Sequence, residues 1–247
     1  MNQAIIDIKD LHKSYNNLQV LQGVDLDIKR GETITILGGS GTGKSVLLKL
    51  IAGLEKPDQG EIRINERDIV PLKEDELVPI RKKIGMLFQG AALFDSLSAG
   101  ENVAYPIREH FRLSEGEIER MVGEKLRMVG LEGIEEKMPA ELSGGMKKRV
   151  GLARAIAIDP EIILYDEPTT GLDPANTQRI NQLIVELQKI LKVTSIVVTH
   201  DLDSAYQVTD RLALLHQGRI AMTGTKEEFE ASPMQEVQDF IAKKIVE

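Results

Sequence analysis

The chain contains no cysteine among its 247 residues. Disulfide bonds, thiol nucleophiles and cysteine-ligated metals are therefore excluded, and the absence mildly favours a cytosolic protein. Basic residues are in deficit: 31 Lys and Arg stand against 39 Asp and Glu, so the formal net charge is −8. Neutralising the phosphates of a nucleic acid needs an excess of Lys and Arg over Asp and Glu, so we expect no nucleic-acid partner.

Long hydrophobic runs are also missing. The longest stretches without charge, such as residues 33–43 and 84–94, are far shorter than the roughly 20 residues of a membrane-spanning helix. Residues 1–13 carry acidic side chains and no apolar run, unlike a signal peptide. We therefore expect that this chain does not cross a membrane by itself.

No linker, repeat or low-complexity tract divides the chain, and 42% apolar with 28% charged residues is a globular balance. Partial alternation before residue 30 and strict alternation over residues 61–65 indicate a half-exposed antiparallel sheet. Residues 33–37, 162–165 and 194–199 are short apolar runs rich in β-branched residues. Such runs are typical of strands in a parallel sheet that helices cover on both faces.

Helical patterns fill the rest. Asp173 as N-cap, Pro174 as first residue and an apolar stripe as far as Leu191 predict a helix between the last two buried strands. Residues 114–129 and 144–158 also follow a helical pattern, and the second of these segments comes directly after a serine that can serve as N-cap. We expect one α/β domain over residues 1–247, with a core at 1–94 and 160–247 and a helical subdomain inserted at 95–159.

A glycine-rich segment follows the first buried strand and fits G-x-x-x-x-G-K-[ST], the phosphate loop. Its glycines let backbone N–H groups close around the phosphates of a nucleotide. Lys44 adds a positive charge, and the Ser45 hydroxyl can bind Mg²⁺. The strand before the loop and the apolar helix after it weaken the alternative of an ordinary glycine turn. The loop consists of Gly38, Gly39, Ser40, Gly41, Thr42, Gly43, Lys44 and Ser45.

Acidic residues follow the second buried strand, and a histidine follows the third. Asp166 ends an apolar strand in the Walker B pattern and is expected to hold Mg²⁺ through its water shell. Glu167 is then placed to orient an attacking water. Alone, such a pair is usually a solvated turn, but after a phosphate loop the functional interpretation is favoured. His200 can donate to a γ-phosphate oxygen, whereas a lone histidine is more often structural.

A serine and two glycines open the helix predicted from residue 144. Ser143 is expected to cap it, while Gly144 and Gly145 leave backbone N–H groups bare for an anion. Between a phosphate loop and a Walker B strand, residues 142–146 resemble the signature motif of ABC-type ATPases. Further matches to that family follow in the same order as in the family: Tyr15 resembles the aromatic residue that stacks on adenine, Gln89 the Q-loop glutamine, Gly171, Leu172 and Asp173 the D-loop, and His200 the switch histidine.

This resemblance implies a P-loop NTPase with a RecA-like parallel sheet core, and an enzyme that hydrolyses ATP with Mg²⁺. It implies that Glu167, His200 and Gln89 are catalytic, and that Ser45, Gln89 and Asp166 hold the metal. In the family, the serine and glycines of the signature motif face the nucleotide of a second subunit, so the resemblance also implies a head-to-tail homodimer. The residues it assigns to nucleotide binding are Tyr15, the phosphate loop 38–45, Ser143, Gly144, Gly145 and Asp173.

Within that family the chain looks like the ATPase of MCE-associated, Mla-type lipid transporters. The match lies in Met146, which replaces the common glutamine of the signature, and in residues 85–97 and 101–110. It implies phospholipid transport between inner and outer membrane, driven from the cytoplasmic face of a bacterial inner membrane. The implied partners are integral permease subunits, which dock near residues 90–97, and an MCE-domain protein. An Mla-type ATPase can also bind a small STAS-domain protein, and the resemblance leaves this partner open.

Two alternatives remain. The ATPase of a polar-solute importer, for amino acids or ions, would share every nucleotide motif. A soluble ABC ATPase without a transport role is less favoured, because the sequence shows no second phosphate loop, long coiled coil or basic surface.

Overall fold

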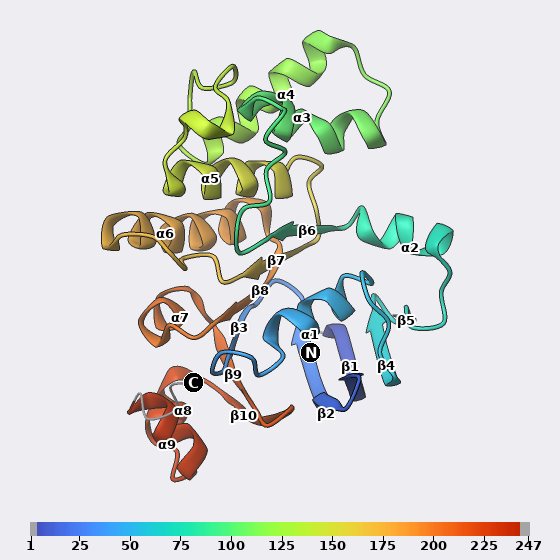
Figure 1. Ribbon diagram of the computed structural model, residues 1–247, viewed down its shortest axis with the longest axis vertical. Helices are drawn as coiled ribbons and strands as arrows, with labels where there is room; N and C mark the ends of the chain where they lie inside the picture. The colour runs from blue at the N-terminus through green and yellow to red at the C-terminus, as the bar shows by residue number, and fades with distance from the viewer. Residues whose placement is uncertain (1–3, 243–247) are drawn as a thin grey trace. The chain divides into compact units, whose positions relative to one another are not determined.

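Two units make up the chain, whose computed structural model describes residues 4–242 (Figure 1). The first unit comprises Met1–Arg81 and Thr194–Glu247, and the second comprises Lys82–Val193. Among the helices within residues 4–242, none is long and apolar enough to cross a bilayer.

An antiparallel sheet of four strands forms one part of the first unit, in the order β2-β1-β4-β5. Its long strands expose one face and bury the other, as the alternation of apolar residues predicted, and its apolar face includes Ile6, Ile8 and Ile62. The half-exposed antiparallel sheet expected from the sequence is thus confirmed. The strands are β1 (Ala4–Tyr15), β2 (Leu18–Lys29), β4 (Gln59–Ile64) and β5 (Arg67–Asp68).

A second group of strands in this unit centres on β3 (Thr33–Leu37). This strand is parallel to β8 (Thr194–Thr199) on one side and to β9 (Arg211–His216) on the other. All residues of β3 and β8 are buried, as expected for strands covered on both faces. The remaining elements of the unit are β10 (Arg219–Gly224), antiparallel to β9, and the helices α1 (Lys44–Ile51), α2 (Glu74–Arg81), α7 (Leu202–Val208), α8 (Lys226–Glu230) and α9 (Gln235–Ile241).

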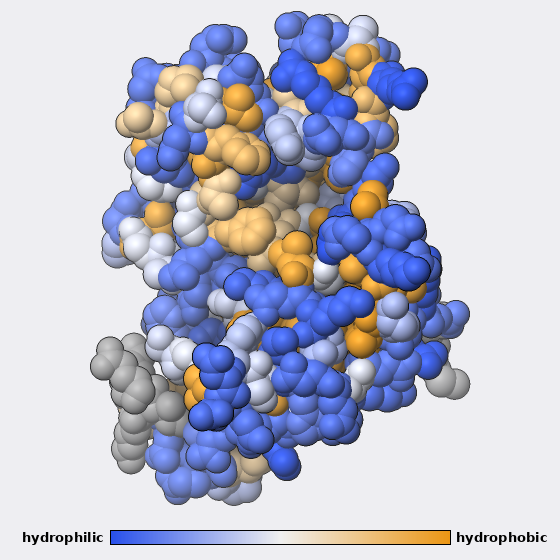
Figure 2. Space-filling view, turned by 45° about the vertical axis from the view of Figure 1, so that its right-hand side comes forward, coloured by the Kyte–Doolittle hydropathy of each residue, from blue (hydrophilic) through white to orange (hydrophobic). Residues whose placement is uncertain are grey.

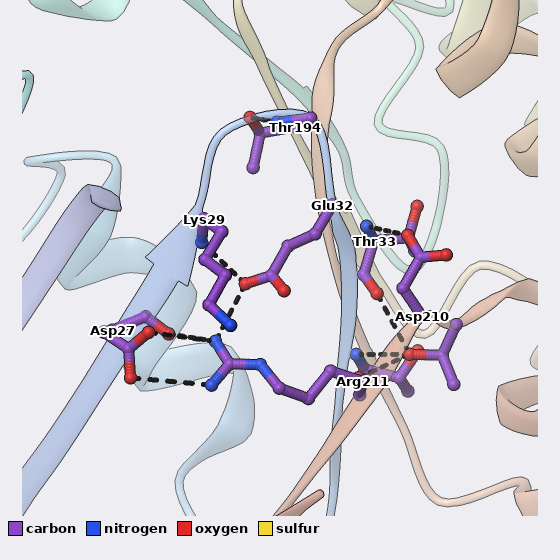
Figure 3. A network of polar contacts seen from close by, with 10 residues as sticks. Asp27, Lys29, Glu32, Thr33, Thr194, Asp210 and Arg211 are labelled. Atoms are coloured by element: carbon purple, nitrogen blue, oxygen red, sulfur yellow. Dashed lines mark hydrogen bonds and ion pairs between the residues drawn. The ribbon is translucent and has the colours of Figure 1, made fainter. Parts of the chain in front are cut away.

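A polar network fixes the start of β3 (Figure 3). The Arg211 guanidinium donates to Glu32 Oε1 at 2.8 Å and to the backbone oxygen of Asp27. Glu32 Oε1 also accepts from the Lys29 backbone N–H at 2.6 Å, and Asp210 Oδ2 accepts from the Thr33 N–H at 2.8 Å. Because these bonds join three strands, they hold in place the strand that leads into the phosphate loop.

The second unit combines a parallel strand pair with helices. Strand β6 (Ile84–Leu87) pairs with β7 (Ile162–Asp166). Helix α5 (Gly144–Ala155) packs on β6 and also contacts α3 (Ala99–His110), α4 (Glu115–Met128) and α6 (Pro174–Leu191). A 3₁₀ turn at Pro139–Glu141 precedes α5.

The caps predicted for these helices are present, but one predicted end was wrong. Ser143 accepts from the Met146 N–H at 3.3 Å before α5, and Asp173 accepts from the Asn176 N–H at 3.0 Å before α6. The helix expected over residues 144–158 ends at Ala155, because Ile156 leaves helical geometry (φ −97°, ψ 3°). Turn bonds follow, including the Asp159 N–H to the Ile156 oxygen at 3.2 Å, and they redirect the chain towards β7.

Candidate functional site

The phosphate loop leaves the first unit's sheet at the end of β3 and enters α1. Gly43 precedes the helix in the left-handed region (φ 100°), and a Cβ there would lie 2.8 Å from Val20 Cγ1, so only glycine fits. No side chain caps the helix, which leaves backbone N–H groups directed at the loop. Lys44 Nζ is buried and donates to the backbone oxygens of Gly38 and Gly39 at 2.9 and 2.8 Å.

His200 lies beside this loop at the same edge of the sheet. Leu37 and Thr199 are register partners in the parallel pair β3–β8, so Gly38 and His200 are the next residues of adjacent strands. His200 is exposed. Ligands of parallel sheets bind beyond the carboxyl ends of the strands, and the structure therefore brings these two predicted site elements together.

Tyr15 stands at the end of β1 with its ring 40% exposed. Its hydroxyl donates to Glu55 Oε2, and Lys13 Nζ lies 5.3 Å from the ring centroid. Burial, together with the hydrogen bond to the Glu55 carboxylate, raises the pKa of Tyr15 to about 12. The ring is thus held at its polar end and remains partly exposed, as a residue that contacts a ligand must be.

Three predicted residues follow the strand pair of the second unit. Leu87 and Tyr165 are register partners, so Gln89 after β6 and Asp166 with Glu167 at the end of β7 leave the same edge. Gln89 is exposed, whereas Asp166 and Glu167 are each only 7% exposed. Two buried carboxylates side by side are expensive unless a function or a counter-charge maintains them.

Within the second unit, Lys148 on α5 supplies a counter-charge, and the sequence analysis did not single this residue out. It is 5% exposed, and its Nζ donates to the backbone oxygen of Glu167 at 3.0 Å. Burial lowers the pKa of Lys148, and the carboxylates of Asp166 and Glu167 oppose that shift. Helical spacing was a usable signal, because Lys148 follows the buried Gly145 by three residues and precedes the buried Leu152 by four.

The serine and glycines of residues 143–145 begin α5 as expected. Ser143 is exposed, and its Oγ accepts from the Met146 N–H at 3.3 Å. A Cβ on Gly145 would lie 2.2 Å from Asn176 Oδ1, so this position has no room for a side chain. Asn176 also donates to Asp173. The start of α5 and the start of α6 are therefore fitted to each other.

A cation would find oxygen ligands in these segments. Among the described residues, no cluster of three or more His, Cys, Asp or Glu side chains could hold a metal ion. Within the second unit, the Asp166 carboxylate and the Gln89 amide leave the same edge of the strand pair, and such oxygen donors suit Mg²⁺, which keeps several waters and binds nucleotide phosphates.

The first unit thus has a phosphate loop with a neighbouring histidine, and the second unit has an acidic pair at a strand end; these are the parts of a nucleotide-hydrolysing cassette. The family model described as ABC transporter matches residues 21–170. The chain belongs to the ABC transporter family and is one of its ATPase subunits, with the fold of a P-loop NTPase.

Relatives extend the comparison over nearly the whole chain. The intermembrane phospholipid transport system ATP-binding protein MlaF of Haemophilus influenzae is 43% identical over 241 residues, which cover 98% of this chain and 91% of that protein. The probable ribonucleotide transport ATP-binding protein mkl of Mycobacterium leprae is 44% identical over 236 residues, or 96% of this chain and 68% of that protein. For mkl of Mycobacterium tuberculosis the matched share of that protein is 66%.

A solved structure agrees with the fold. The ATP-binding cassette MJ0796, a dimer in a post-hydrolysis state bound to ADP and Pi, matches with a TM-score of 0.84 and 37% identity. The match covers 89% of this chain and 98% of that one.

Proposed function

We propose that this ATPase powers phospholipid transport between two membranes, acting through a separate permease at the cytoplasmic face of a bacterial inner membrane. The observation that carries the proposal is the 43% identity to an MlaF protein over almost the full length of both chains. The phosphate loop, signature segment and acidic pair supply the ATPase, and the partner proteins supply the path for the lipid.

ATP binds with its phosphates in the loop 38–45. Lys44 then exchanges its two backbone acceptors for β- and γ-phosphate oxygens, which are stronger acceptors because they are charged. Tyr15 stacks on the adenine ring. Ser45, Gln89 and Asp166 would hold Mg²⁺, directly or through water, and the bound cation would neutralise phosphate charge.

Hydrolysis depends on three residues of this chain. Glu167 accepts a hydrogen bond from the attacking water and orients it, Gln89 helps to position that water, and His200 donates to the γ-phosphate. Ser143, Gly144 and Gly145 of one subunit, with Asp173 beside them, complete the site of a second copy in a head-to-tail homodimer. The dimeric cassette of similar fold supports this arrangement.

Replacing Glu167 tests the catalytic assignment. Glu167→Gln keeps the shape but weakens the acceptor, so we expect a loss of about 10²- to 10⁴-fold in single-turnover hydrolysis. ATP binding should survive, since the phosphate loop is untouched, and size-exclusion with Mg-ATP should show a stable dimer. A rate within about threefold of the wild type would remove Glu167 from the mechanism.

Aromatic side chains in the second unit supply a surface for the permease. Phe94 and Tyr105 are each 45% exposed, and their ring centroids lie 4.9 Å apart. Arg154 lies 5.7 Å from the Phe94 centroid and donates to the backbone oxygens of Ala91 and Ala92, both at 2.7 Å. Figure 2 shows hydrophilic side chains over most of the visible surface and apolar ones in limited groups. Exposed aromatic rings on such a surface favour a protein contact.

A matched pair of variants tests this contact. Phe94→Asp should abolish co-purification with the permease while ATP binding stays unchanged. Phe111→Asp is the control, because Phe111 is equally exposed at 45% but lies beyond the C-terminal end of α3. Equal loss in both variants, or a folded Phe94→Asp protein that still binds the permease, would contradict the assignment.

The cargo is tested with the purified complex in donor and acceptor vesicles. ATP-dependent transfer of labelled phospholipid, lost in Glu167→Gln, supports the proposal. Uptake of a ribonucleotide without lipid transfer would favour the activity named for the mycobacterial relatives, and uptake of an amino acid or ion would favour a polar-solute importer. The same preparation should contain an MCE-domain protein, and mass spectrometry of it would also show whether a STAS-domain protein is present.

A further inference from the structure

The backbone of Glu167 has an unusual conformation. Glu167 follows β7 with φ 46°, in the left-handed region that residues with a side chain seldom adopt. Such a conformation persists only where surrounding contacts enforce it, and it is concentrated at functional sites. The direction of the Glu167 side chain depends on this turn, so whatever holds the peptide also aims the carboxylate.

Two residues hold it within the second unit. Lys148 Nζ donates to the Glu167 backbone oxygen at 3.0 Å, and the Thr170 N–H donates to the same oxygen at 3.3 Å. Thr170 Oγ1 also donates to Glu167 Oε2 at 3.1 Å. Thr170 is a near neighbour along the chain, whereas Lys148 comes from a different element, 19 residues away.

Lys148 is also chemically unusual at this position. Lys148 as a whole is only 5% exposed, and burying its ammonium group carries a large desolvation cost. A buried hydrogen bond to a carbonyl oxygen and two nearby carboxylates offset that cost. A methionine would fill the same volume without the cost, so an apolar core does not explain the lysine.

We propose that Lys148 is a positioning residue for hydrolysis: it clamps the Glu167 peptide in its left-handed turn and so aims the carboxylate at the attacking water. The clamp extends from α5, the helix that begins at the Ser143–Gly145 segment. It therefore ties the helix proposed to contact the partner's nucleotide to the residue proposed to orient water. This inference rests on the proposed role of Glu167.

The test compares Lys148→Met, which keeps the length and loses the donor, with Lys147→Met. Lys147 directly precedes Lys148 on α5 and is half-buried. Lys148→Met should lower the single-turnover rate about 10- to 100-fold, the cost of a misplaced catalytic group, with ATP affinity within about twofold of the wild type. Lys148→Arg, which keeps a charged donor, should recover most of the rate, and Lys147→Met should leave it unchanged.

A double variant separates positioning from a merely structural role. If Lys148 acts through Glu167, then Lys148→Met should lower the rate less than about threefold further in a Glu167→Gln protein. Losses that multiply, or a wild-type rate in Lys148→Met beside a slow Glu167→Gln, would overturn the clamp while the role of Glu167 stands. A fast Glu167→Gln protein would instead overturn the proposed mechanism itself. If Lys148→Met does not fold, Lys148→Leu, which also lacks a donor, takes its place in the same cycle, with the same outcomes.

Discussion

The Asn102 side chain makes several hydrogen bonds within the second unit, and its removal should lower the free energy of unfolding by a measurable amount. The side chain is fully buried in α3. Its Oδ1 accepts from the Phe94 N–H at 2.9 Å, and its Nδ2 lies within hydrogen-bond distance of the backbone oxygens of Phe94, Leu97 and Ser98 at 3.0–3.1 Å. One amide therefore shapes the loop that presents Phe94 to the proposed permease surface.

The loss in the free energy of unfolding is estimated from the hydrogen-bonding groups that lose their partner in Asn102→Ala. The oxygens of Ser98 and Phe94 keep other backbone donors, the N–H groups of Asn102 and Leu97. The Phe94 N–H and the Leu97 oxygen lose the partners described above. An orphaned buried group costs about 1–3 kcal/mol, and these two are only partly buried, so the lower half of the range applies. Because alanine has a higher helix propensity than asparagine, the substitution stabilises α3 by about 0.5 kcal/mol. Two such groups cost about 2–4 kcal/mol, so we expect a net loss of about 1.5–3.5 kcal/mol in the free energy of unfolding.

Urea unfolding followed by circular dichroism measures this loss. Tyr105→Ala is the control, because it removes an exposed ring from the same helix without touching the network, and it should cost less than about 1 kcal/mol. A loss below about 1 kcal/mol in Asn102→Ala would refute the hydrogen-bond accounting. Permease binding should also weaken in Asn102→Ala, since the loop under Phe94 is no longer held.

Three further predictions concern nucleotide binding and the dimer. Lys44→Ala should sharply weaken ATP binding in a filter or calorimetric assay, and wild-type affinity would contradict its phosphate contact. Ser143→Arg should block hydrolysis yet leave ATP binding to the phosphate loop intact; normal turnover would refute the head-to-tail site. Glu55→Gln should lower the pKa of Tyr15 from about 12 towards its ordinary 10. The titration is followed by the absorbance of the phenolate, and the signal of Tyr15 is identified as the one that is missing in a Tyr15→Phe protein. Because the unfolded phenol ionises first, stability should fall as pH rises from 10 towards 12 in the wild type and less so in Glu55→Gln, and an unchanged titration would rule out the Glu55 contact.

Local signals determined much of this protein before any tertiary contact was considered. The strands at residues 33–37 and 194–199 have the predicted bounds, because short apolar runs rich in β-branched residues have few other stable conformations. The phosphate loop was equally readable, since its glycines, lysine and serine are adjacent in the chain. Helix caps such as Asp173 act within one turn, so sequence spacing alone locates them.

What the sequence left undecided depends on residues that are distant in the chain. The Lys147–Lys148–Arg149 run looks like a charged stretch; helical spacing can place Lys148 on the buried face of α5, but only the tertiary structure shows its hydrogen bond to Glu167. The hydrogen bonds of Asn102 and the strand junction at Arg211 are likewise invisible in a local window. The end of α5 at Ala155 is set by the turn into β7 rather than by helix propensity. A local pattern reports the intrinsic preference of a segment, whereas a buried charge or amide is stable only where the fold brings its partners to it, and that placement is decided by tertiary structure.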